Sequence, residues 1–212
     1  MDELKNLSII PLRYSMISSL LHNYKDTKNK VRKMEKSGLL IRLKKGLYVV
    51  SPKVTHENVS KNLISNHLYG PSYISLETAL SFYGLIPERT VATYAVTSKR
   101  GKKYETPLGY FEYVGVSEKY FSIGVRQESL KKQFSFLIAT PEKALCDIII
   151  TRAGIRFQSK KAIREFLMKD LRFDMSSMVK WNLSIIELCQ EAGYKKKELF
   201  LLKEYLKDEY GI

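Results

Sequence analysis

Eight Lys and Arg side chains lie within residues 28–45, with Glu35 as the single carboxylate among them. They are Lys28, Lys30, Arg32, Lys33, Lys36, Arg42, Lys44 and Lys45. Residues 1–50 carry a net charge of +7, half of the +14 of the 212-residue chain. Such a concentration of positive charge favours a polyanion through release of counterions, and arginine can also pair with guanine edges. The chemistry expected is therefore nucleic-acid recognition, and the plain alternative is a solvated helix face.

The stretch from Asp26 to Val50 must hold these cations in place. Asp26 or Thr27 can cap a helix whose apolar face carries Val31 and Met34, and Ser37-Gly38 is a typical helix end. Residues 39–44 and 47–50 are rich in strand-forming side chains and flank Lys45-Gly46, which predicts a tight hairpin. A cationic helix followed by a hairpin with a cationic tip is typical of a winged helix-turn-helix domain.

The flanking elements are predicted from apolar spacing. A helical turn is expected at Asp2–Leu7 and a second helix at Leu12–His22, after Pro11. Ser51-Pro52-Lys53 is the predicted connection, which gives a winged helix-turn-helix domain at 1–53 and a mixed α/β domain at 54–212. In the second domain, helices are expected at 58–68, 75–84, 140–149, 159–171, 183–192 and 197–210, and strands at 91–96, 110–114, 121–125 and 134–138. The predicted fold class is thus α+β, ending in helices.

The composition limits the other classes of function. The 44% hydrophobic content is enough for a folded core, no apolar run approaches the roughly 20 residues of a membrane span, and the start of the chain does not resemble a signal peptide. A cytoplasmic protein is expected. Cys146 and Cys189 lie in helical apolar patterns and are expected to be free, buried thiols.

No catalytic, metal or cofactor site is predicted. The histidines His22, His56 and His67 are scattered and do not have the spacing of metal ligands. No glycine-rich phosphate loop is present, and the only acidic-x-Lys triplets are in the amino-terminal region, away from any predicted strand. The residues therefore predict a protein that is not an enzyme.

The chain resembles the AbiEi family, the antitoxins of bacterial AbiE type IV toxin–antitoxin systems, which take part in phage defence. The resemblance covers nearly the whole chain and rests on four segments in this order, SGLLIRLKKGLYVV, GPSYISLETALSFYGLIPE, TPLGYFEY and ATPEKALCDII, which begin at Ser37, Gly70, Thr106 and Ala139. It implies an amino-terminal winged domain that binds inverted repeats in its own promoter as a repressor. It also implies a carboxy-terminal domain that counteracts a nucleotidyltransferase-like toxin.

The expected partners are therefore double-stranded promoter DNA and a nucleotidyltransferase-like toxin. Two alternatives stay open: a nucleic-acid-modifying enzyme of nuclease type that the winged domain targets, and a stand-alone transcriptional regulator. The repressor and antitoxin functions are expected to separate near Ser51–Thr55, because positive charge is concentrated before this connection and diffuse after it.

Overall fold

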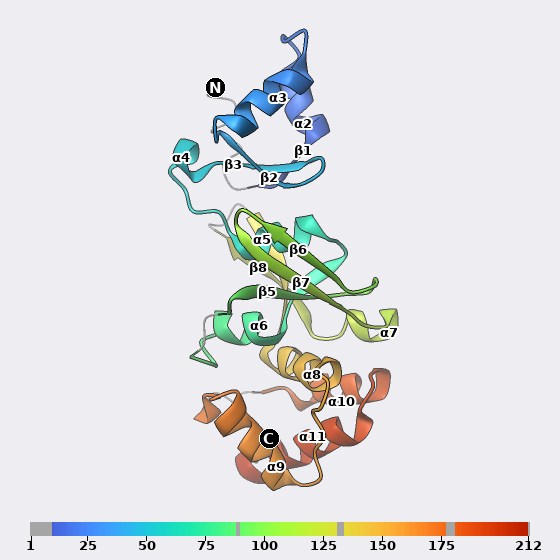
Figure 1. Cartoon of the computed structure of the whole chain (residues 1–212). Coiled ribbons are helices and arrows are strands. Elements are labelled where there is room, and N and C mark those ends of the chain that lie inside the picture. The colour runs from blue at the N-terminus through green and yellow to red at the C-terminus, as the bar shows by residue number, and fades with distance from the viewer. Residues whose placement is uncertain (1–9, 88–89, 131–133, 177–180, 212) are drawn as a thin grey trace.

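The computed structural model describes residues 10–87, 90–130, 134–176 and 181–211. This part of the chain contains helices together with parallel and antiparallel strands, so the expected α+β class is confirmed. The molecule is elongated, with two helices at one end, the larger sheet in the middle and the C-terminal helices at the other end (Figure 1). The helical turn expected at Asp2–Leu7 lies outside the described residues.

Residues 10–50, the N-terminal unit, combine two helices with a small antiparallel sheet of order β1-β3-β2. The elements are β1 (Leu12–Arg13), α2 (Tyr14–Leu20), α3 (Thr27–Lys36), β2 (Leu40–Lys44) and β3 (Leu47–Val50). The prediction of a helix starting at Leu12 was wrong. Leu12 and Arg13 pair with β3, and the Tyr14 N–H donates to the Gly46 carbonyl at 2.9 Å. Pairing with a distant strand thus delays the helix by two residues.

Helix α3 has the ends that its sequence predicts. The Asp26 carboxylate accepts the Asn29 N–H at 2.9 Å and so caps the first turn. Gly38, at φ +72°, provides the left-handed residue that ends the helix, and the Leu39 N–H donates to the Met34 carbonyl at 2.9 Å. Val31 and Met34 are buried against the small sheet and α2. The opposite faces of α3 are left for charged residues.

The predicted connection after the hairpin is a short helix rather than an irregular segment. Helix α4 (Pro52–Thr55) begins with proline at its first turn, and the Ser51 hydroxyl accepts the Lys53 N–H at 3.3 Å. Helix α5 (Lys61–Leu68) follows and is capped by the Ser60 hydroxyl. It begins three residues later than predicted and leads directly into the larger sheet.

The larger sheet has the strand order β6-β7-β5-β4-β9-β8. Its strands are β4 (Ser72–Ile74), β5 (Ala92–Thr97), β6 (Lys102–Thr106), β7 (Gly109–Gly115), β8 (Val125–Leu130) and β9 (Phe134–Ala139). The sequence did not predict β4, β6 or β8, and the strand expected at 121–125 was wrong. There the chain forms the short helix α7 (Glu118–Phe121) and turns at Gly124, at φ +60°. Tyr120 of α7 is buried in the core.

Helices cover the sheet and form the far end of the molecule. They are α6 (Leu76–Phe82), α8 (Pro141–Thr151), α9 (Lys160–Glu165) with a π-helical continuation at Phe166–Asp170, α10 (Leu183–Ala192) and α11 (Lys196–Tyr210). Thr140 caps α8 as predicted, by accepting the Lys143 N–H at 3.4 Å. Ser75 precedes α6 as predicted but does not cap it, because its hydroxyl donates to Asp147 instead. Among the described helices, none has the length and apolar content to cross a membrane.

The β2–β3 hairpin belongs to two hydrophobic cores at once. One face contributes Leu40, Tyr48 and Val50 to the small core beneath α2 and α3. The other face contributes Leu43, Leu47 and Val49 to the large core, together with residues of α5 and the larger sheet. The two units therefore meet across a shared layer, which fixes the position of the hairpin relative to the rest of the molecule.

Candidate nucleic-acid interface

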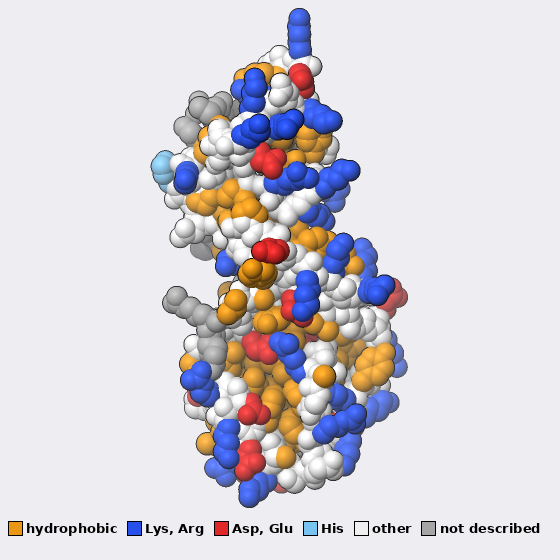
Figure 2. Space-filling model, in the orientation of Figure 1, with side chains coloured by type: hydrophobic (Ala, Val, Ile, Leu, Met, Phe, Trp, Pro, Cys, Tyr) orange, Lys and Arg blue, Asp and Glu red, His pale blue; other side chains and the backbone are white. Residues whose placement is uncertain are grey.

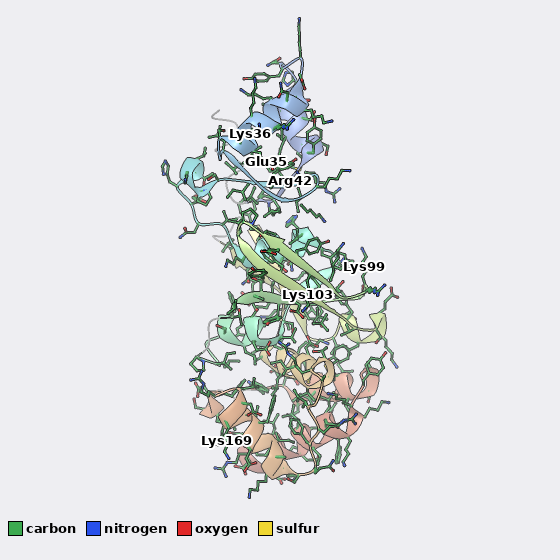
Figure 3. The ribbon with its side chains drawn as sticks, in the orientation of Figure 1. Glu35, Lys36, Arg42, Lys99, Lys103 and Lys169 are labelled. Atoms are coloured by element: carbon green, nitrogen blue, oxygen red, sulfur yellow. The ribbon has the colours of Figure 1, made fainter. Side chains whose placement is uncertain are left out.

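Five of the eight predicted cations line one groove between α3 and the hairpin. They are Lys28, Arg32 and Lys36 on α3, Arg42 on β2 and Lys45 at the hairpin tip. The groove has a volume of about 790 Å³. Figure 3 shows Lys36 and Arg42 on the neighbouring helix and strand, and Figure 2 shows blue side chains gathered over this part of the surface.

The helix and the hairpin explain why these five side chains converge. Lys28, Arg32 and Lys36 are four residues apart and so follow one side of α3. Lys45 is placed at the tip by the turn through Gly46, at φ +79°, a conformation that glycine adopts without strain. All five cationic side chains are exposed to solvent. Their charges are therefore available to a ligand that enters the groove.

The floor of the groove is apolar, and one wall carries a negative charge. Tyr14, Val31 and Tyr48 lie between the cations, and Glu35 lines the groove beside them. The tyrosines were not predicted as part of the site, because Tyr14 reaches the groove only through the pairing of β1 with the hairpin. Glu35 was visible in the sequence as the single carboxylate among the cations. Its negative charge repels phosphate and so weakens non-specific attraction of a polyanion to the groove. Binding then depends more on specific contacts.

The other three predicted residues lie elsewhere. The Lys30 ammonium lies over the Tyr24 ring, 4.5 Å from its centroid, and Lys33 is exposed without lining the groove. Lys44 turns to the opposite face of the hairpin, where its ammonium donates to the Leu68 carbonyl at 2.5 Å. Burial lowers the pKa of Lys44, and repulsion from Lys102, Arg13 and Lys99 adds to this effect. Lys44 is thus part of the contact between the two units.

A buried polar cluster at the centre of the large core was not predicted. Lys143 and Asp147, both on α8 and both fully buried, form an ion pair with 3.2 Å between Nζ and Oδ1. The second carboxylate oxygen accepts the hydroxyls of Tyr73 at 3.1 Å and Ser75 at 2.5 Å. The Lys143 ammonium also donates to the Tyr120 carbonyl and lies over its ring. The cluster thus joins α8 to β4 and α7.

The two cysteines of the described chain, Cys146 and Cys189, are buried and unpaired by disulfide, as expected. Burial raises the pKa of the Cys146 thiol well above its usual value. Within the described ranges, no group of three or more His, Cys, Asp and Glu side chains is arranged to hold a metal ion.

Comparisons with known proteins show a fold relationship. No family model and no curated protein matches the sequence. Among solved structures, the Rv2827c protein from Mycobacterium tuberculosis is similar, with a TM-score of 0.59. The match covers 99% of this chain and 75% of that chain at 10% sequence identity. A similar fold over nearly the whole of this chain therefore occurs in a solved protein of very different sequence.

Proposed function

We propose that the chain is a DNA-binding transcriptional repressor and antitoxin, and that the groove of α3 and the hairpin is its DNA-binding site. The main observation in support is that five exposed cations, from α3 and the hairpin, line one groove. A major groove about 12 Å wide admits a helix such as α3, and a hairpin beside that helix can contact the adjacent backbone. The order helix, helix, hairpin in the N-terminal unit supports a winged helix-turn-helix.

The proposed roles of the cations follow from their chemistry. Arg32 and Arg42 carry planar guanidinium groups, which can form two hydrogen bonds with a guanine edge. Lys28, Lys36 and Lys45 carry compact ammonium groups that suit phosphate oxygens. Loss of an arginine should then relax sequence preference, whereas loss of a lysine should weaken binding to all duplexes alike.

The antitoxin part of the proposal rests on the resemblance to the AbiEi family. In this proposal residues 54–212 counteract a nucleotidyltransferase-like toxin, and the protein acts in the cytoplasm, where its promoter lies. Exposed apolar side chains on the C-terminal helices, such as Leu188 and Phe200, are available for contact with a protein. No observation on the described residues favours the nuclease alternative.

DNA binding is tested by fluorescence anisotropy with a duplex from the chain's own promoter and a scrambled duplex of equal length. If the three groove lysines each neutralise one phosphate, the logarithm of affinity should fall with the logarithm of salt at a slope of about −2.7, at roughly −0.9 for each phosphate. Lys28→Gln with Lys36→Gln should reduce this slope to about −0.9. Lys169→Gln is the matched control, because Lys169 is exposed on the C-terminal helices, far from the groove in Figure 3. An unchanged slope in the folded double variant would remove the groove from the proposal.

Antitoxin activity is tested by expressing the chain beside the gene adjacent to its own. Relief of growth inhibition by the full chain supports the proposal, provided that the Lys28→Gln, Lys36→Gln variant also relieves it. Promoter repression without a toxic neighbour would favour the stand-alone regulator. Cleavage or modification of the bound duplex would favour the enzyme.

A further inference from the structure

A second groove lies on the other face of the hairpin, where the two units meet. It has a volume of about 580 Å³, and its polar lining includes Arg13 of β1, Lys44 of β2 and His67 of α5. Met16 and Leu47 form part of its apolar wall. We call this the seam groove. Arg13 and Lys44 belong to the small sheet of the N-terminal unit, and docking of the two units places His67 beside them.

The seam groove concentrates positive charge without an acidic partner. Among the residues that the structure describes, no carboxylate lines it and neither Arg13 nor Lys44 forms an ion pair. Repulsion is visible in the pKa of His67, which burial and then the Arg13 guanidinium lower below its usual 6.5. Lys44 is likewise repelled by Arg13 and by two lysines from the loop and strand beyond β5. Repulsion among positive charges that line one groove lowers the stability of the fold, and a bound anion would offset this repulsion.

We propose that the seam groove is a binding site for a phosphate group. The Arg13 guanidinium offers planar paired donors, and the Lys44 ammonium keeps two N–H donors after its bond to Leu68. The imidazole of His67 completes a set of donors that converges from three directions. The Asn66 amide bonds to the backbone of Ser72 and Leu137, which leaves one N–H of its nitrogen as a further donor.

The surroundings of the groove suit a phosphate ester better than a free halide. Met16 and Leu47 give an apolar wall against which the carbon side of an ester can lie. Beyond the groove, the Lys102 ammonium lies over the rings of Tyr69 and Tyr104, at 5.6 and 5.0 Å from their centroids. Lys99, labelled in Figure 3, lies 5.9 Å from the Tyr69 ring centroid. These side chains extend the positive field, so the phosphate can belong to a free ester or to a DNA backbone.

The first experiment titrates the full chain with inorganic phosphate at constant pH and ionic strength, with sodium chloride as the balancing salt. The imidazole resonances of the three histidines are followed by NMR. We expect a saturable shift of His67, while His22 and His56, which do not line the seam groove, serve as internal controls. A His67 response that does not saturate, or that matches the responses of His22 and His56, would overturn the site.

The second experiment compares Arg13→Gln with Lys103→Gln in the same titration. Lys103 is an exposed cation paired with Glu112 at 3.1 Å and lies outside the seam groove. Removing the charge-assisted bonds of Arg13 should weaken phosphate binding about tenfold, whereas Lys103→Gln should leave it unchanged. Equal affinities for the two variants would overturn the assignment. Arg13 is exposed, and a thermal melt checks that its variant stays folded.

A DNA duplex then distinguishes the sources of the phosphate group. Displacement of phosphate from His67 by the duplex, with a salt slope reduced by about 1 in Arg13→Gln, assigns the site to a backbone phosphate. Duplex binding that leaves the His67 signal unchanged assigns the site to a free ester. Failure of the duplex to bind would contradict the proposed function, yet the phosphate titration would still decide the seam groove.

Discussion

Replacing Asp147 with Asn would keep the shape of the side chain and remove its charge. The fully buried Lys143 ammonium would then lose the carboxylate that lies 3.2 Å away. The hydroxyls of Tyr73 and Ser75 could still donate to the amide oxygen, so their hydrogen bonds need not be lost. The main effect is therefore an uncompensated positive charge in the core.

The magnitude follows from this geometry. Removal of one partner of a buried ion pair typically costs about 3–5 kcal/mol. The Tyr120 ring and carbonyl still face the Lys143 ammonium, and a desolvated cation–π contact contributes roughly 2 kcal/mol. We therefore expect Asp147→Asn to lower the free energy of unfolding by about 3 kcal/mol, near the lower end of that range.

Urea denaturation of both single variants and the double variant tests this reasoning. Lys143→Met combined with Asp147→Asn removes both charges, so the double variant should be more stable than Asp147→Asn alone by at least about 1 kcal/mol. A cost below about 1 kcal/mol for Asp147→Asn, or strictly additive effects, would show that the two charges do not stabilise each other.

At the proposed DNA-binding site, Glu35→Gln should tighten duplex binding about two- to fivefold in anisotropy, because it removes a charge that repels phosphate; weaker binding would contradict this. Lys45→Gln should weaken DNA binding at unchanged stability, whereas Lys44→Gln should mainly lower the thermal midpoint, since Lys44 joins the two units; identical effects would reject the distinction. Leu145→Ala, at a fully buried position, should lower the free energy of unfolding by about 2–5 kcal/mol in urea. A wild-type value would place the core elsewhere. The folded-state pKa of His67 lies below 6.5, so the unfolded chain takes up the proton first. Stability contributed by neutral His67 is thus present above pH 6.5 and is lost as the pH falls. His67→Gln should flatten this decline in thermal midpoints, and an unchanged profile would exclude His67 as its source.

Helices with clear capping residues at their ends were predicted from the local sequence. Helix α3 follows from Asp26 and Gly38, and α8 follows from Thr140-Pro141, because these residues satisfy helix ends wherever the helix packs. Strand β4 was missed because it has only three residues, too few to show an alternating pattern. It forms a strand because it pairs with β5 and β9. The helix at Glu118 was missed because its buried Tyr120 is held by contacts with α8.

The candidate site was predicted in part for the same reason. Spacing along α3 was enough to place Lys28, Arg32 and Lys36 on one side of the helix. The face of the hairpin on which the Lys44 side chain lies depends on a register shift between Arg42 and Lys44. This shift cannot be predicted from the sequence. The seam groove depends on docking between residues far apart in the chain, so no local pattern predicts it.

Because the β2–β3 hairpin packs into both hydrophobic cores, it also limits how the two units can be exchanged during evolution. A unit attached by a flexible linker can be exchanged between genes without regard to its new neighbour. Here Leu43, Leu47 and Val49 of the hairpin are nearly inaccessible to water because the large core covers them. Division of the chain after Thr55 would leave that apolar face, and the part of the large core that it covers, open to aggregation. Recombination that replaced only residues 1–55 would need an incoming hairpin that fits the large core, so the two units are expected to be inherited and to change together.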